Sequence, residues 1–267
     1  MMTRALLLLL ALGLGLPAQA GSGLIRLTDR DDLFGWEAVG RVEITPGGYC
    51  TGALIAPDLV LTAAHCVYDD EGRARETGAL SFKAGLRDGK FISESGVVAV
   101  AAHESYDPGA RLTARNIRHD VALLRLAEPI PAATASPFRL ARGSRKGRPV
   151  SVVSYGEGRD AALSWQRECA VLEAAGDLMA FDCDVTFGSS GAPVFQREGG
   201  RARIVSLISG GGEHDGRRIA YGMTLPEVVD RLKRDLRATP ATDGTVAAKR
   251  LRVGQGGGAA GAKFAKP

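Results

Sequence analysis

Short runs of hydrophobic residues alternate with polar, turn-rich breaks along most of this chain. The breaks combine glycine, proline and aspartate in ways that favour turns, as in Pro46-Gly47-Gly48 and Arg87-Asp88-Gly89. Regularly spaced strands without helices between them are typical of an all-β barrel or sandwich rather than of alternating strand–helix units. The runs predicted as strands are residues 39–44, 51–55, 59–63, 80–83, 97–101, 121–126, 150–154, 168–172, 179–182, 192–195, 202–209 and 219–224.

One segment departs from this pattern and is predicted as a helix. Residues 226–236 begin with proline and glutamate, which favour the first turn of a helix. Apolar residues then recur at the spacing that places them on one helix face: Val228, Val229, Leu232 and Leu236. The expected fold class is therefore all-β with a C-terminal helix.

The predicted strands fall into two clusters, which indicates a folded domain built from two halves. Residues 130–137 are rich in proline and alanine, lie between the clusters and are predicted as the crossover. Residues 238–267 are rich in glycine and alanine and offer little to bury, so they are predicted as a disordered tail. Residues 21–237 are thus expected to form the folded domain.

Residues 1–20 have the pattern of a secretory signal peptide. Arg4 supplies a positive charge, residues 5–16 are apolar, and Ala18-Gln19-Ala20 is a small-x-small cleavage pattern. A membrane-spanning helix needs about 20 apolar residues, more than this run provides. We expect cleavage after Ala20 and a secreted or periplasmic protein; an uncleaved anchor is the alternative.

The composition is that of an ordinary soluble globular protein, with 45% hydrophobic and 24% charged residues among 267. The formal net charge is +4, but the basic excess lies in Arg4 and in residues 238–267. The expected domain is therefore close to neutral, and a nucleic-acid-binding surface is not expected. We expect a monomer with no membrane contact after the signal is removed.

The cysteines are even in number and belong to a chain expected in an oxidising compartment, which predicts disulfides. Four cysteines allow three pairings, and the preferred one joins neighbours in sequence. Each local loop then spans about 15 residues, and closing it is worth on the order of 3 kcal/mol. The preferred pairs are Cys50–Cys66 and Cys169–Cys183. No Cys-x-x-Cys motif occurs, so neither a metal site nor another cofactor is expected.

Three short stretches carry residue types that together support nucleophilic catalysis. His65 follows an apolar run and a turn of small residues, Asp120 precedes an apolar strand, and Ser190 lies in the glycine-flanked loop 188–191. Each residue alone has an ordinary structural explanation. Together they are what acyl transfer needs, because a serine hydroxyl requires a base to accept its proton and an acid to orient that base.

These stretches resemble the trypsin/chymotrypsin-like serine peptidases, nearest to their bacterial V8-like branch. The resemblance is carried by Thr62-Ala63-Ala64-His65-Cys66 and Gly188-Ser189-Ser190-Gly191-Ala192-Pro193, is supported by residues 119–124, and covers about residues 35–237. The order His, Asp, Ser is the order of that family. The resemblance implies a chymotrypsin-like fold of two antiparallel six-stranded β-barrels, with the site in the cleft between them.

The resemblance also implies a role for each residue at that site. Ser190 would attack the peptide carbonyl, His65 would act as general base and then acid, and Asp120 would orient the imidazole. The backbone N–H groups of Gly188 and Ser190 would form the oxyanion hole. Cys50 and Cys66 would match the disulfide that holds the histidine loop.

One departure from the family concerns the residue before the nucleophile. In animal trypsins it is an aspartate that pairs with a new N-terminal ammonium group when the zymogen is cleaved. Here the residue is Ser189, which is uncharged. We therefore do not expect activation through that ion pair.

Specificity is expected to depend on Asp184, which by ungapped spacing matches the floor of the trypsin S1 pocket. A desolvated carboxylate there would favour cleavage after Arg or Lys. Ser209 and Gly211 would hold the substrate backbone. Cleavage after Glu is an alternative, although V8-like enzymes carry a histidine where this chain has Ile208. Small apolar P1 residues are the third option.

Two other functions compete with a secreted serine endopeptidase acting on polypeptides. An α/β-hydrolase esterase would need the order Ser, acid, His, which this chain does not have. A catalytically inactive secreted β-barrel that binds a partner is the rival from a different class. It would be favoured by a broken triad, yet His65, Asp120 and Ser190 are all present.

Overall fold

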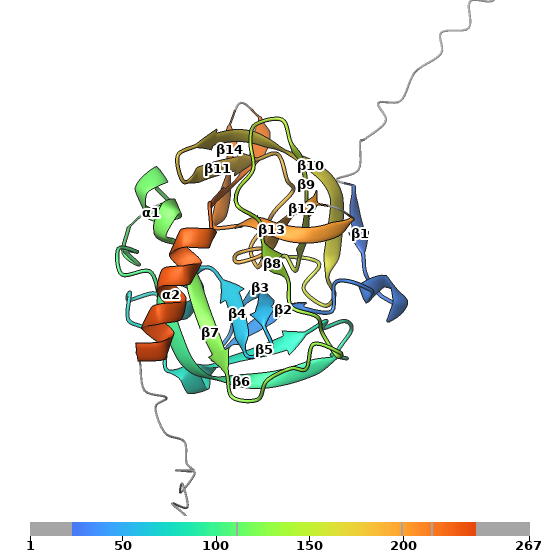
Figure 1. The fold of residues 1–267 in the computed structure, drawn as a ribbon, viewed down its shortest axis with the longest axis vertical. Coiled ribbons are helices and arrows are strands. Elements are labelled where there is room, and N and C mark those ends of the chain that lie inside the picture. The colour runs from blue at the N-terminus through green and yellow to red at the C-terminus, as the bar shows by residue number, and fades with distance from the viewer. Residues whose placement is uncertain (1–22, 111, 199, 215, 239–267) are drawn as a thin grey trace, which may run out of the picture.

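The computed structural model describes residues 23–110, 112–198, 200–214 and 216–238. Two β-structures lie one beside the other, with a C-terminal helix along one side (Figure 1). The predicted signal peptide and the predicted tail, apart from Ala238, lie outside the described residues.

The first half is a closed six-stranded antiparallel barrel. Its strands follow the order β2-β3-β4-β7-β6-β5, and β2 pairs with both β3 and β5 to close it. Side chains of β6 alternate between buried and less buried positions, whereas all four residues of β4 are buried. The strands are β2 (Val39–Ile44), β3 (Tyr49–Ala56), β4 (Leu59–Thr62), β5 (Leu80–Ala84), β6 (Ser93–Ala102) and β7 (Ala122–Leu126).

The second half is a nine-stranded sheet that curls back on itself. Its order is β14-β15-β11-β10-β9-β12-β13-β8, with β1 added to β10. The Ser209 N–H, just after β13, donates to the Tyr221 carbonyl of β15 at 2.8 Å and so links distant strands of the path. The strands are β1 (Leu24–Arg26), β8 (Arg139–Leu140), β9 (Pro149–Ser154), β10 (Ser164–Ala175), β11 (Leu178–Phe181), β12 (Pro193–Glu198), β13 (Arg201–Leu207), β14 (Gly210–His214) and β15 (Arg217–Met223).

The expected all-β fold with a C-terminal helix is confirmed, but the second half is larger than expected. The six predicted strands of this half are joined by β1, β8 and β14, and β8 pairs with β13 in parallel rather than antiparallel fashion. β1 is only three residues long and β8 only two, and β14 begins with three glycines. None of the three has the apolar alternation from which strands are predicted.

The structure has two α-helices in its described part. α2 (Pro226–Ala238) buries Val229, Leu232 and Leu236 and packs against β6 and β7 (Figure 1). α1 (Ala114–His119) was not predicted, because six residues are too few for a helical repeat to be recognised. Short 3-10 turns complete the helical structure: η1 (Asp31–Leu33), η2 (Ala64–Val67) and η3 (Thr77–Ala79).

A cluster of four aromatic rings joins the two halves. Trp36 precedes β2, Phe138 ends the connection from β7 to β8, and Trp165 and Phe195 belong to β10 and β12. Ring centroids lie 5.0 Å apart for Trp36–Phe195 and 4.6 Å apart for Phe138–Phe195. Buried aromatic pairs in tilted contact stabilise a fold beyond their area, so this cluster fixes one half against the other.

Two disulfides are formed, and they are the local pairs preferred from the sequence. Cys50 of β3 is bonded to Cys66 of η2, and Cys169 of β10 is bonded to Cys183 just after β11. The described residues include no unpaired cysteine. Each bridge lies close in sequence to a candidate catalytic residue, His65 or Ser190.

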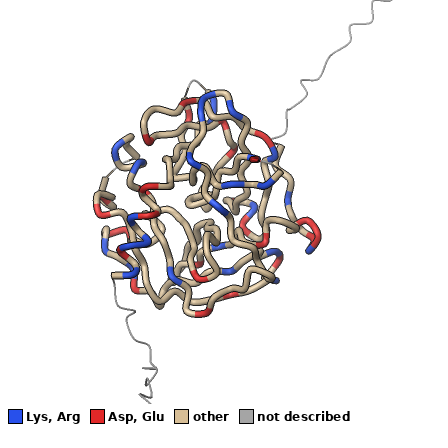
Figure 2. The backbone as a smooth tube through the Cα atoms, viewed as in Figure 1, with Lys and Arg blue, Asp and Glu red and all other residues tan. Residues whose placement is uncertain are grey.

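Acidic and basic positions are interspersed along the backbone of the described residues (Figure 2). This distribution agrees with the near-neutral charge expected for residues 21–237. Of the helices in the described residues, none has the length and apolar character that crossing a bilayer requires.

Candidate functional site

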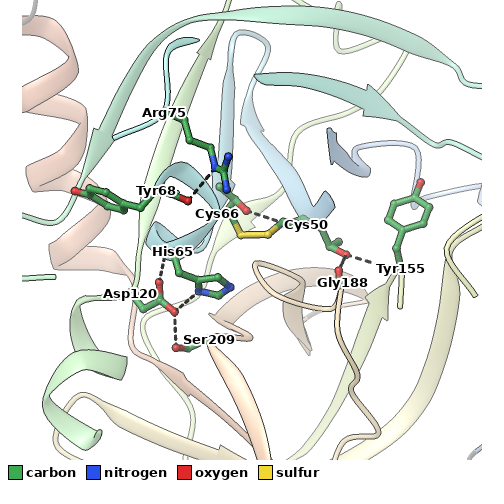
Figure 3. The surroundings of a disulfide bond; sticks show 11 residues. Cys50, His65, Cys66, Tyr68, Arg75, Asp120, Tyr155, Gly188 and Ser209 are labelled. Atoms are coloured by element: carbon green, nitrogen blue, oxygen red, sulfur yellow. Dashed lines mark hydrogen bonds and ion pairs between the residues drawn. A yellow bond between two sulfur atoms is a disulfide. The ribbon is translucent and has the colours of Figure 1, made fainter. Parts of the chain in front are cut away.

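His65 and Asp120 meet because their strands are neighbours. β4 and β7 are antiparallel and pair Thr62 with Ala122, so the residues after β4 and before β7 lie at the same end of the barrel. His65 follows β4 on η2, and Asp120 is the C-cap residue of α1, two positions before β7 begins. The His65 Nδ1–H donates to Asp120 Oδ2 at 2.8 Å, and the backbone N–H of His65 donates to Oδ1 at 2.9 Å (Figure 3).

The Asp120 carboxylate is buried and bonded on both oxygens. Its side chain is 4% exposed, and Ser209 Oγ from the second half donates to Oδ2 at 2.5 Å (Figure 3). The sequence analysis does not predict this role of the Ser209 side chain, because it expects Ser209 to hold the substrate backbone. No local signal marks it, because 89 positions separate the two residues.

His65 is partly exposed and has a raised pKa. Burial by itself would lower the pKa, but the charge of Asp120 and its hydrogen bond to Nδ1 more than compensate, so the pKa of His65 lies above 6.5. With Nδ1 donating to Asp120, the neutral ring presents Nε2 as an acceptor. That is the form a general base needs.

Ser190 lies in a tight loop of the second half that is bonded to the first barrel. Thr51 donates from its N–H to the Ser190 carbonyl and from Oγ1 to the Gly188 carbonyl, both at 2.8 Å. Gly188 and Gly191 have φ values of +88° and +78°. A Cβ at Gly191 would lie 2.2 Å from Thr62 Oγ1, so the loop needs glycine for both conformation and space.

Within the described residues, the N–H groups of Gly188 and Ser190 have no hydrogen-bond acceptor. The neighbouring N–H groups of Ser189 and Gly191 are bonded, to the carbonyls of Thr186 and Ile208. These two unbonded donors are the ones that the family resemblance implies for an oxyanion hole.

One cleft brings the candidate residues together. It has a volume of about 600 Å³, and both halves contribute to it. His65, Asp120, Ser190, Ser209 and Gly211 all line it. Ser190 Oγ makes no hydrogen bond to His65 within the described residues, which is common before substrate arrives.

Asp184, the residue expected at the pocket floor, is not among the residues that line this cleft. Its Oδ1 accepts a hydrogen bond from Arg218 Nη1 at 3.0 Å, and its N–H donates to Gln166 Oε1 at 2.7 Å. The carboxylate is therefore paired with Arg218, a residue that does line the cleft. Sequence spacing gave the position of Asp184 along the chain but not its partner on β15.

The cleft wall next to Asp184 is apolar. Val185, Ile208 and Ile219 line it together with the glycines at the start of β14. A Cβ on Gly211 would lie 3.1 Å from Val185 Cγ2, so a side chain at position 211 would press against Val185. Val185 thus approaches the backbone at the start of β14.

Cys50, His65 and Cys66 form a cluster whose potential metal-ligand atoms lie within 4.8 Å of one another. The two sulfur atoms are joined in a disulfide, so they offer no thiolate. His65 Nδ1 is bonded to Asp120. This cluster is therefore not suited to hold a metal ion.

Comparison with known proteins gives several similarities. The family model described as a trypsin-like peptidase domain matches residues 50–202. Glutamyl endopeptidase of Bacillus licheniformis is 25% identical over 155 residues, which is 58% of this chain and 47% of that protein. Serine protease 23 of Bos taurus is 25% identical over 207 residues, which is 68% of this chain and 53% of that protein. The chain thus spans about half the length of these relatives.

The fold is also found in a solved structure of Glu endopeptidase in complex with MPD. The two superpose with a TM-score of 0.67 at 18% sequence identity, over 81% of this chain and 97% of the other. At this identity the likeness concerns the fold alone.

Proposed function

Since the chain belongs to the trypsin-like peptidase family, we propose that it is a secreted serine endopeptidase in which Ser190, His65 and Asp120 form the catalytic triad. The observation that carries the proposal is the His65–Asp120 pair, held at 2.8 Å in the cleft that also contains Ser190. Its substrates are polypeptides, the substrate class that membership of a peptidase family implies.

The reaction proceeds through an acyl-enzyme. Ser190 Oγ forms a bond to the peptide carbonyl carbon while His65 Nε2 accepts the hydroxyl proton. The tetrahedral intermediate then collapses, the C–N bond breaks, and His65 returns the proton to the leaving amine. Water, deprotonated by His65, hydrolyses the ester and frees Ser190 in the second half of the cycle.

Asp120 acts through His65 and not on the substrate. Its carboxylate fixes the Nδ1–H tautomer and stabilises the imidazolium that forms during each proton transfer. The hydrogen bond from Ser209 satisfies the same carboxylate oxygen and limits the ways in which Asp120 can move. The base is thus held in one orientation before substrate binds.

The unbonded N–H groups of Gly188 and Ser190 are the donors for the oxyanion. Negative charge develops on the carbonyl oxygen only as Ser190 attacks, so donors placed for that charge lower the barrier without strengthening ground-state binding equally. The loss of one such donor typically costs about 10²-fold to 10³-fold in kcat.

For P1 specificity, three observations favour a small apolar side chain over Arg or Lys. Asp184 is already paired with Arg218, Ile208 is apolar, and Val185 approaches Gly211 closely. Glu is the alternative, favoured by the presence of Arg218 in the cleft wall and by the name of one relative, glutamyl endopeptidase.

A set of matched peptides with Ala, Arg, Glu or Phe at P1 tests this specificity. We expect the highest kcat/KM for the Ala peptide. The variant Val185→Gly should raise kcat/KM for the Phe peptide by about 10-fold, because one methylene more or less in a hydrophobic pocket changes kcat/KM by about 10-fold to 200-fold. Asp184→Ser should leave the rate on the Arg peptide unchanged. Preference for Glu that Arg218→Gln abolishes would replace the small-residue assignment with the acidic one.

Covalent labelling by a fluorophosphonate tests the proposed function itself. Ser190 Oγ should displace fluoride and form a phosphonate ester, which intact mass and peptide mapping locate. Because only the neutral form of His65 accepts the serine proton, and its pKa lies above 6.5, the labelling rate should rise with pH through that raised value.

The labelling experiment also separates the rival function. Wild-type protein that is folded but does not react would favour the inactive binding module. Reaction at the same rate from pH 5 to pH 9 would contradict a mechanism that depends on His65. Ser190→Ala is the control for labelling at other nucleophiles.

A further inference from the structure

A half-buried guanidinium group lies beneath the loop that carries Ser190. Arg159 comes from the turn after β9, and its Nη2 donates to Ser189 Oγ at 3.0 Å. Its Nη1 donates to the Ser154 carbonyl at 2.8 Å and to Ser154 Oγ at 3.1 Å. The side chain thus connects the end of β9 to the residue immediately before the nucleophile.

Ser189 is the point where the contacts of this loop converge. It is fully buried, and its Oγ donates to the Tyr155 carbonyl at 2.9 Å while accepting from Arg159. The N–H of Thr186 also approaches Oγ, at 3.3 Å. Because Ser189 lies between Gly188 and Ser190, fixing its side chain fixes the peptide groups that carry both oxyanion donors.

The surroundings of Arg159 are shaped for a guanidinium group. Among the described residues no carboxylate lies within ion-pair distance of it, and its bonds go to Ser154 and Ser189. Burial lowers the pKa of Arg159, and the nearby charge of Asp184 partly opposes this. A Cβ on Gly156 would lie 2.7 Å from Arg159 Cζ, so the backbone there also makes room for the group.

We propose that Arg159 is a positioning residue that holds the oxyanion-binding loop in its active conformation through Ser189. This inference rests on the proposed peptidase function. Arg159 touches neither substrate nor reacting atoms; it keeps the N–H groups of Gly188 and Ser190 directed at the oxyanion. Since the oxyanion exists only beyond the ground state, loss of Arg159 lowers kcat and leaves KM nearly unchanged.

The test compares Arg159→Met with a matched control, Arg125→Met. Arg125 is also half-buried and donates to a carbonyl, that of Leu236 in α2, on the side of the barrel that α2 covers. We expect kcat of Arg159→Met to fall about 100-fold, the scale of one lost oxyanion donor, with KM within about 2-fold of wild type. Arg125→Met should retain wild-type kcat.

Two further measurements separate positioning from general loss of structure. Affinity for a peptidyl boronic acid, which bonds to Ser190 Oγ as a tetrahedral adduct, should fall with Arg159→Met in parallel with kcat. Arg159→Lys should recover part of the loss because it keeps a cationic donor. If Arg159→Met does not fold, Ser189→Ala removes the same contact from the other partner and should show the same split between kcat and KM.

Several outcomes would overturn the proposal. They are an Arg159→Met variant with kcat within 3-fold of wild type, equal losses in kcat for both arginine variants, or a change confined to KM. Failure of the proposed function itself is distinguishable, since wild-type protein would then neither hydrolyse peptides nor react with the fluorophosphonate.

Discussion

Ser190→Ala should lower kcat for peptide hydrolysis by a factor on the order of 10⁶, the scale seen when a triad nucleophile is removed. Without Oγ no acyl-enzyme forms, and only the cleft and the oxyanion donors act on the substrate. The substitution removes one oxygen from a partly exposed side chain. The loop remains bonded to Thr51 through backbone carbonyls, so thermal unfolding should be unchanged.

The measurement is steady-state kinetics on a peptide that the wild-type protein cleaves. The variant must be purified free of wild-type protein, because a trace of it would mask a loss of this size. Ser81→Ala on β5, in the barrel wall and also partly exposed, is the matched control and should keep full activity. Peptidase activity of Ser190→Ala comparable to wild type would show that another group is the nucleophile.

Asp120→Asn should lower kcat by about 10⁴-fold with the fold intact. The amide matches the carboxylate in size but brings donors to a site where the partners are themselves donors: the Ser209 hydroxyl, the His65 N–H and Nδ1–H. It favours the wrong imidazole tautomer and no longer stabilises the imidazolium. The pKa of His65 should fall as well, because the charge that raises it is lost.

The pH dependence of residual activity is therefore the diagnostic measurement for Asp120→Asn. Its rise with pH should move to lower pH than in wild type. Asp177→Asn, which changes a carboxylate bonded to Thr224 outside the cleft, is the control. A wild-type rate in Asp120→Asn would mean that His65 is oriented by other contacts.

The parts of the fold that could be predicted are those governed by local pattern. The continuous apolar runs at residues 97–101 of β6 and in β4 identify strands directly, whereas residues 93–96 of β6 have no such run and were not predicted. The short histidine and serine motifs then located His65 and Ser190, whose tight turns need small residues at fixed places. Gly191 is one of these places, since no other residue fits against Thr62.

The parts that could not be predicted depend on contacts between distant segments. Asp184 and Arg218 are 34 positions apart, and no sequence pattern near either residue predicts that they pair. The same is true of Arg159 and Ser189, which are 30 positions apart. α1 was missed for a different reason, because its one short turn is stabilised by the Thr113 cap and by packing rather than by a repeat.

The proposed triad draws its residues from both halves of the molecule, so it is complete only when the two halves have docked. His65 and Asp120 belong to the barrel, whereas Ser190 and Ser209 arrive from residues that follow it in the chain. Bonds from Thr51 to Ser190 and from Ser209 to Asp120 form only when the halves dock. If the chain is the peptidase proposed above, a nascent or partly unfolded chain holds an incomplete triad and would not cleave its neighbours, so proteolysis would begin only once the whole domain has folded.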